Sequence, residues 1–195
     1  MGGLISLLAA AEPRASAGET ADAIFVFAGG QARKEFAATA WRRGRAPILV
    51  VSVARFEWRR FALLGLPGTE TLHAAVERVP PVERHFFVIL ERGNAEVRHV
   101  PPRRWGTRNE ARALAAFARE RAWGSLLVIS SEFHLGRVAR TVRRALEGSG
   151  VAVLYAAPPA ESDPHGPGRW WRSRLGLRLV GSEIVKRIAY VFLKP

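Results

Sequence analysis

The stretch Leu126-Leu-Val-Ile-Ser-Ser-Glu-Phe-His-Leu-Gly-Arg137 decides the fold, because an apolar run ends abruptly in polar side chains and a helical pattern follows directly. Short continuous apolar runs are typical of strands buried on both faces of a parallel sheet. The polar side chains therefore come at the carboxyl end of a strand, where open α/β sheets bind ligands. They predict an anion or phosphate site formed by Ser130, Ser131, His134 and Arg137. Ser131 as a helix cap and His134 as a packed side chain would be a structural alternative.

The rest of the chain alternates strands and helices in the same way. Apolar runs predict strands at residues 23–28, 47–53, 125–130 and 151–156, and Gly93-Asn94 predicts the turn of a hairpin between 85–90 and 95–100. Helical spacing predicts helices over 31–43, 70–78, 107–122, the arginine-rich segment after 131, and 182–192, with helical turns around Trp58 and Phe61. This order predicts an α/β fold, a Rossmann-like three-layer sandwich with a mainly parallel sheet.

Composition excludes several classes of chemistry. The 195 residues contain no cysteine, so disulfides, thiolate metal sites and a cysteine nucleophile are ruled out. The histidines at 73, 85, 99, 134 and 165 show no close ligand spacing, and only Asp22 and Asp163 are aspartates, so we expect no metal site. No internal stretch approaches the roughly 18 apolar residues of a membrane span.

The net charge of +13 comes almost entirely from arginine, since only Lys34, Lys186 and Lys194 of the 30 basic residues are lysine. The arginines are spread over nearly every segment, so a general bias toward arginine explains most of the charge. Arg137, Arg140 and Arg144 share one helical face, with Arg143 beside them. Such a face could meet phosphate or an anionic membrane surface, or could simply be solvated.

The amino terminus differs from the remainder. Residues 2–11 are apolar and residues 12–20 have the composition of a linker, which predicts either the remnant of an export signal or membrane anchor, or a frayed tail. We expect residues 1–20 to pack little against a single domain formed by residues 21–195.

Further polar or glycine positions fall at the same sheet edge as the first cluster. They are Gly29, Gly30, Arg33, Ser52, Thr107, Asn109 and Glu110. Helix-start N–H groups and Arg137 could hold an anion there, and His134 could transfer a proton near neutral pH. Glu110 could orient His134 or bind a substrate hydroxyl. Gly29-Gly30 lacks the full G-x-G-x-x-G pattern, and Thr107 with Glu110 also matches a helix capping box, so structural alternatives remain.

Five segments in this order resemble one known family. They are residues 21–30, Gly106-Thr-Arg-Asn-Glu-Ala111, Leu127-Val-Ile-Ser-Ser-Glu-Phe-His-Leu-Gly-Arg137, Trp170-Trp-Arg-Ser-Arg174, and Glu183-Ile-Val-Lys186 with Tyr190. Together they are similar to the YdcF-like family, the bacterial ElyC/SanA/YdcF group, over about residues 22–193. The chain departs from the family pattern at two positions. Ala28 precedes Gly29-Gly30 where three glycines are common, and Gly136 precedes Arg137.

The resemblance implies a Rossmann-type fold and a place in the bacterial cell envelope or at the membrane, with the cytoplasm as the alternative. It implies polyprenyl-phosphate or cell-wall precursor metabolism, with S-adenosylmethionine as a ligand of one member and no settled reaction.

Three functions follow as hypotheses. The first is an envelope-associated protein that binds, and hydrolyses or transfers, a phosphorylated or nucleotide-like ligand. The second is a non-catalytic S-adenosylmethionine or nucleotide module, and the third an arginine-rich adaptor for anionic membrane or, less readily, nucleic acid. Clustering of Arg33, His134 and Arg137 in one pocket would favour the first. A hydrolase based on Ser130 or Ser131 with His134 lacks the Gly-x-Ser-x-Gly motif.

Overall fold

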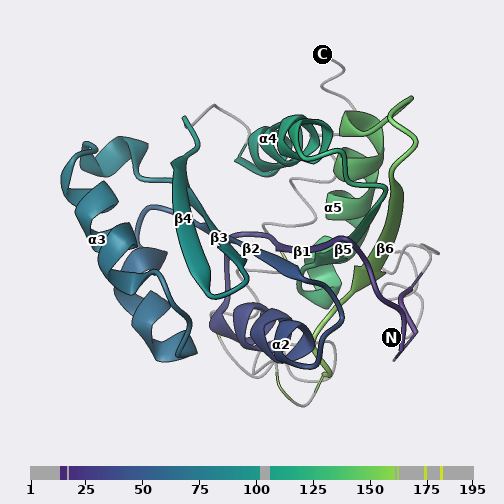
Figure 1. Cartoon of the computed structure of the whole chain (residues 1–195), viewed down its shortest axis with the longest axis horizontal. Coiled ribbons are helices and arrows are strands. Elements are labelled where there is room, and N and C mark those ends of the chain that lie inside the picture. Colours follow the sequence, from purple (N-terminus) through teal and green to yellow (C-terminus); the bar gives the residue numbers. More distant parts are fainter. Residues whose placement is uncertain are drawn as a thin grey trace.

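The chain folds as an α/β sandwich in which helices cover both faces of a six-stranded mixed sheet (Figure 1). The computed structural model describes residues 14–16, 18–101 and 106–160, together with residues 162, 174 and 181. The predicted Rossmann-like three-layer architecture is confirmed.

The strand order is β4-β3-β2-β1-β5-β6. Strands β1, β2, β5 and β6 run parallel, while β3 and β4 form a hairpin whose first strand pairs antiparallel with β2. Their bounds are β1 Ala23–Val26, β2 Ile48–Val53, β3 Phe86–Glu91, β4 Asn94–His99, β5 Ser125–Ile129 and β6 Ala152–Ala156. All of the predicted strands are present, within two residues at each end.

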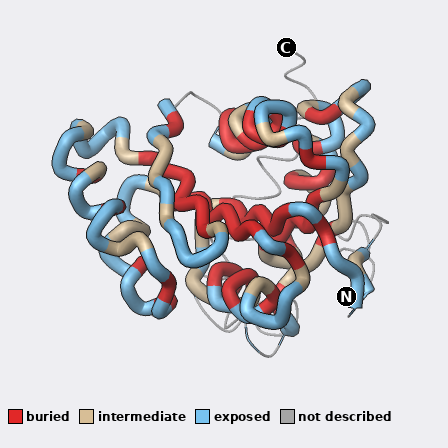
Figure 2. Tube along the Cα trace, in the orientation of Figure 1, coloured by how far each residue is buried: buried red, intermediate tan, exposed pale blue. Residues whose placement is uncertain are grey.

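Two apolar cores lie on opposite faces of the sheet. One face packs against α4 (Gly106–Glu120) and α5 (Glu132–Ala145), through residues such as Phe25, Leu114 and Val138. The other packs against α2 (Gln31–Arg42), the 3-10 helix η1 (Glu57–Leu64) and α3 (Thr69–Glu77). A short 3-10 turn, η2 (Pro81–Glu83), precedes β3. Because both faces are covered, the inner strands are continuously buried, which Figure 2 shows as the red band across the centre.

The site position follows from the two crossovers on either side of β1. Helix α2 connects β1 to β2 on one face, and α5 connects β5 to β6 on the other. The two connections leave neighbouring strands β1 and β5 in opposite directions, so the carboxyl ends of these strands form a topological switch point. Open α/β sheets bind ligands in the crevice at such a point.

The hairpin turn lies one residue earlier than predicted. Arg92 and Gly93 form the two-residue loop, with φ of 49° and 82°, and Asn94 already belongs to β4. Positive φ at both loop positions is the requirement of a type I′ turn, the connection whose twist matches that of paired strands.

The expectation that residues 1–20 pack little against the domain is wrong for their described part. Arg14 forms a parallel bridge to Tyr155, and Ala15 donates its N–H to the Tyr155 carbonyl at 3.0 Å. The Arg45 guanidinium donates to the carbonyls of Ser16 and Glu19. β6 is the edge strand of the sheet, and its outer backbone groups bind the polar segment before the domain.

Several sequence-based expectations lie outside the described residues. They concern the apolar segment 2–11, Trp170-Trp171, and the helix over 182–192 with Glu183, Lys186 and Tyr190. Within the described ranges, no helix combines the length and apolar character needed to cross a bilayer.

Candidate functional site

A cavity of about 740 Å³ opens at the switch point between β1 and β5. The starts of α2, α4 and α5 all contribute to its wall, through Gly30-Gln31, Gly106-Thr107 and Ser131 respectively. The first N–H groups of a helix have no partner within the helix and carry partial positive charge. Three helix starts at one cavity therefore make it suited to an anion.

Arg33 lies across the turn that follows β1. Its Nη1 donates to the Ala28 carbonyl at 2.9 Å, and its Nη2 donates to the Ser131 hydroxyl at 2.8 Å. The guanidinium passes so close to Gly29 that a Cβ there would lie 2.6 Å from Arg33 Cζ. Gly29 is thus required for close approach as well as for its φ of 139°, and Arg33 joins the β1 and β5 exits.

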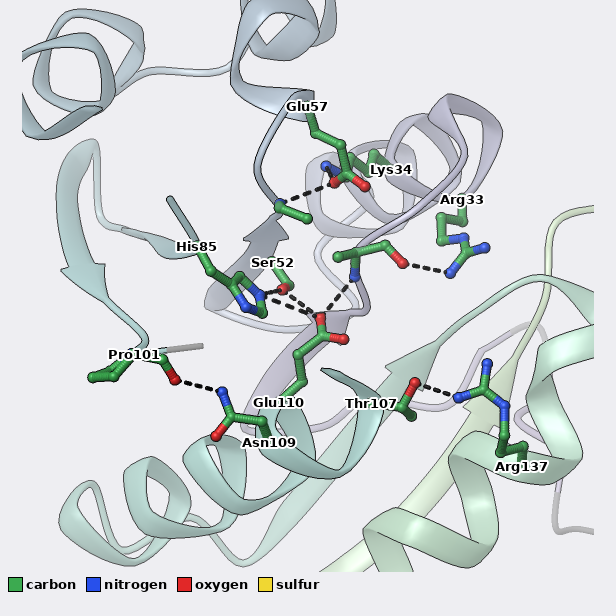
Figure 3. Close-up of polar contacts among 12 residues, drawn as sticks. Arg33, Lys34, Ser52, Glu57, His85, Pro101, Thr107, Asn109, Glu110 and Arg137 are labelled. Carbon is green, nitrogen blue, oxygen red and sulfur yellow. Dashed lines mark hydrogen bonds and ion pairs between the residues drawn. The ribbon is translucent and has the colours of Figure 1, made fainter. Parts of the chain in front are cut away.

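Arg137 joins α5 to α4 at the opposite wall. Its Nη1 donates to the Thr107 hydroxyl (Figure 3), and its Nη2 donates to His134 Nδ1 at 3.4 Å. A histidine that accepts at Nδ1 carries its proton on Nε2 when neutral, so His134 can present a donor to a ligand. Arg137 and His134 both line the cavity.

Glu110 is the buried anion of the site. Its Oε1 accepts the Ala28 N–H at 2.9 Å and the Ser52 hydroxyl at 2.5 Å, and lies 3.6 Å from His85 Nε2. Burial raises the pKa of this carboxyl, but hydrogen bonds and the charge interaction with His85, Ser52 and Ala28 outweigh burial and bring the pKa below its ordinary value. Glu110 is therefore ionised at neutral pH.

Ser52, His85 and Glu110 do not form a nucleophilic triad. The Ser52 hydroxyl gives its only proton to Glu110, so it must accept the bond from His85 Nε2, at 2.8 Å. In a triad, the acid holds the histidine and the histidine takes the serine proton. Here the serine lies between the other two and is fully buried, so the group orients Glu110 instead (Figure 3).

The structure brings most of the predicted site residues to this one cavity. Those that line it are Gly29, Gly30, Arg33, Thr107, Glu110, Ser130, Ser131, His134 and Arg137. Ser52 and Asn109 do not: Ser52 lies beneath the cavity in the Glu110 network, and Asn109 donates to the Pro101 carbonyl at 2.7 Å. Adjacent residues on a helix point to different faces, so Asn109 cannot share the direction of Glu110.

The side chains of Ser131 and Glu110 do not serve as helix caps, which was the structural alternative for both residues. Ser131 occupies the N-cap position of α5 but makes no side-chain capping bond, and its hydroxyl accepts from Arg33 instead. Glu110 bonds across to Ala28, just after β1, and to Ser52 of β2 rather than back to the first residues of α4. Of the two roles considered for Glu110, orienting His134 is not supported by its hydrogen-bond partners, since the histidine beside this carboxylate is His85.

Three residues of the site were missed from the sequence. His85 comes just before β3, and the antiparallel pairing of Ser52 with Phe87 brings the start of β3 to the edge where β2 ends. Gln31 and Arg60 also line the cavity, and the buried Gln31 Nε2 has no hydrogen-bond partner among the described residues. The predicted hairpin at Gly93 was a signal that could have located His85. A hairpin makes one of its strands antiparallel to the rest of the sheet, so the start of that strand lies at the edge where the parallel strands end.

Comparison with known proteins adds no family to this description: no family model, curated protein or solved structure matches the chain. Within the described residues, no group of three or more His, Asp or Glu side chains is arranged to hold a metal ion.

Proposed function

We propose that the cavity binds a phosphorylated or nucleotide-like small molecule, with the phosphate between Arg137 and the starts of α2, α4 and α5. The observation that carries the proposal is the clustering of Arg33, His134 and Arg137 around the cavity with these helix starts. A guanidinium pairs with two phosphate oxygens in one plane and stays charged at every relevant pH. Gln31 Nε2, which has no hydrogen-bond partner within the part of the chain that the structure describes, adds a further donor at the same wall.

The arrangement favours a ligand pocket over a general arginine adaptor. An adaptor would use a broad face in which the arginines are dispersed, whereas Arg33 of α2 and His134 and Arg137 of α5 surround one cavity. The resemblance to the YdcF-like family extends the proposal to a phosphorylated ligand of envelope metabolism, such as a polyprenyl phosphate or a cell-wall precursor.

The cavity also has the groups that phosphate-ester hydrolysis would use. Water would form the new O–P bond and pass its proton to a phosphate oxygen as the P–O bond to the leaving group breaks, while the Glu110 carboxylate accepts a hydroxyl of the substrate. His134 Nε2 would give its proton to the departing oxygen. Release of inorganic phosphate separates an enzyme of this kind from a binding protein.

The proposal is tested by a thermal-shift screen of phosphorylated metabolites and nucleotides, each paired with its unphosphorylated counterpart. Phosphorylated members should raise the midpoint of unfolding, because a ligand that binds only the folded state stabilises it. Hits should then be assayed for phosphate release. A screen in which no phosphorylated compound outperforms its counterpart would contradict the proposal.

A further inference from the structure

The ionised carboxylate of Glu110 is an unusual feature of a cavity suited to phosphate. The Glu110 carboxylate and a bound phosphate would repel each other. Glu110 must therefore accept a hydrogen bond from a part of the ligand other than its phosphate. Glu110 lies one helical turn after Thr107, the residue that holds Arg137. Residues three apart share a helix face, with Cβ atoms about 5–6 Å apart. Thr107 and Glu110 thus face the same side of α4, so a ligand with its phosphate at Arg137 can place a second group beside Glu110.

The two oxygens of Glu110 have different surroundings. Oε1 accepts the Ala28 N–H and the Ser52 hydroxyl and faces His85. Oε2 lies on the side away from Ser52 and His85 (Figure 3), and the residue lines the cavity. The network holds Oε1 in place, and because the carboxylate is rigid, the position of Oε2 is fixed as well.

His85 completes this network from outside the cavity. It is 9% exposed, and its Nε2–H donates to the Ser52 hydroxyl, which in turn donates to Glu110. The His85 N–H engages one of the two lone pairs of the Ser52 oxygen, and this bond favours the orientation in which the hydroxyl proton points at Oε1. His85 therefore biases the Ser52 hydroxyl toward Glu110.

We propose that His85 is a positioning residue that, through Ser52, fixes Glu110 as a hydrogen-bond acceptor in the cavity, so that the cavity selects phosphate esters bearing a hydroxyl or amine donor. This inference rests on the proposed function and specifies its substrate class. A site built to accept a hydroxyl discriminates against an analogue that lacks it, because its own polar group is then left unpaired.

The test uses glycerol 1-phosphate and propyl phosphate, which share a carbon chain and a phosphate and differ in the hydroxyls. Calorimetry on the full chain should show tighter binding of glycerol 1-phosphate. In Glu110→Gln, Ala28 and Ser52 still require an oxygen at the Oε1 position, so the amide NH₂ replaces Oε2 and an acceptor becomes a donor. The preference for glycerol 1-phosphate should fall about tenfold, with propyl phosphate affinity preserved or raised because the repulsion between the two anions is removed.

His85 is tested by two substitutions of different chemistry. His85→Leu removes the donor to Ser52 and should lower the preference about fivefold, whereas His85→Gln retains an N–H donor and should restore most of it. A purely structural role would weaken both esters equally. Should His85→Leu fail to fold, Glu110→Gln decides the hydroxyl preference, and Ser52→Ala, which removes the hydroxyl that His85 contacts, decides the positioning role in its place.

The outcomes separate the two proposals. If the unaltered protein binds neither ester, this inference falls, and the screen of phosphorylated compounds decides the proposed function separately. If it binds both, and the preference is absent or survives in Glu110→Gln and His85→Leu, the inference is overturned while the phosphate site stands.

Discussion

The guanidinium of Arg33 rests against Gly29, where the β1–α2 turn has no room for a side chain: a Cβ on Gly29 would meet Arg33 Cζ at 2.6 Å. The same guanidinium donates to the Ala28 carbonyl, whose residue gives its N–H to Glu110. The turn is therefore held from both sides by side chains of the candidate site.

Gly29→Ala should lower the free energy of unfolding by about 1–3 kcal/mol, the cost of a side chain in a sparsely allowed backbone conformation, because φ at this position is 139°. Urea denaturation measures the change. Gly30→Ala is the matched control, since its φ is −55° and a Cβ there has nothing within 4 Å. Equal losses in the two variants would contradict the assignment of a backbone conformation at Gly29 that only glycine adopts without strain.

Glu110→Gln should flatten the dependence of stability on acid pH. The folded-state pKa of Glu110 is lowered, so its ionisation stabilises the protein fully above the ordinary glutamate pKa of about 4.3, and this contribution is lost as the pH falls through the folded value. Denaturation curves between pH 3 and 7 should therefore diverge at neutral pH and converge in acid. Parallel curves for the two proteins would contradict the assignment of an ionised Glu110.

The Lys34–Glu57 pair allows a different test of buried charge. Lys34 Nζ lies 2.5 Å from Glu57 Oε2, and burial lowers the pKa of this lysine although Glu57 raises it. Glu57→Ala should cost about 2–4 kcal/mol of unfolding free energy, because it leaves a buried ammonium without its partner, whereas Lys34→Met should cost less than about 1 kcal/mol. Denaturation of the two variants in parallel checks the order, and a larger loss in Lys34→Met would refute it.

The sequence predicted the sheet well because its buried strands are short apolar runs, such as Leu126–Ile129, bounded by glycine or polar residues. It also predicted which segments meet at the cavity, since strand exits of a parallel sheet share an edge. Neither inference required knowledge of side-chain direction.

The other features of the site depend on side-chain direction and on strand pairing, which local sequence patterns do not specify. Asn109 and Glu110 are neighbours in the chain, but helix geometry turns only Glu110 into the cavity. His85 reaches Ser52 only because β3 pairs antiparallel with β2, and nothing in the local sequence of residues 85–90 specifies that direction. The contact of Arg14 with Glu132 arises from attachment to the β6 edge, which a linker composition does not predict.

The central claim, that phosphate binds at the Arg137 wall of the cavity, is tested most directly by calorimetry of the strongest phosphorylated hit with Arg137→Ala and Arg140→Ala. Both residues lie on α5, but Arg140 is exposed and does not line this cavity. Arg137→Ala should weaken binding by about 1.5–3 kcal/mol, the value of a hydrogen bond to a charged group, with little loss of stability, while Arg140→Ala should bind as the unaltered protein does. Equal affinity in the two variants, or a loss confined to Arg140→Ala, would contradict the account.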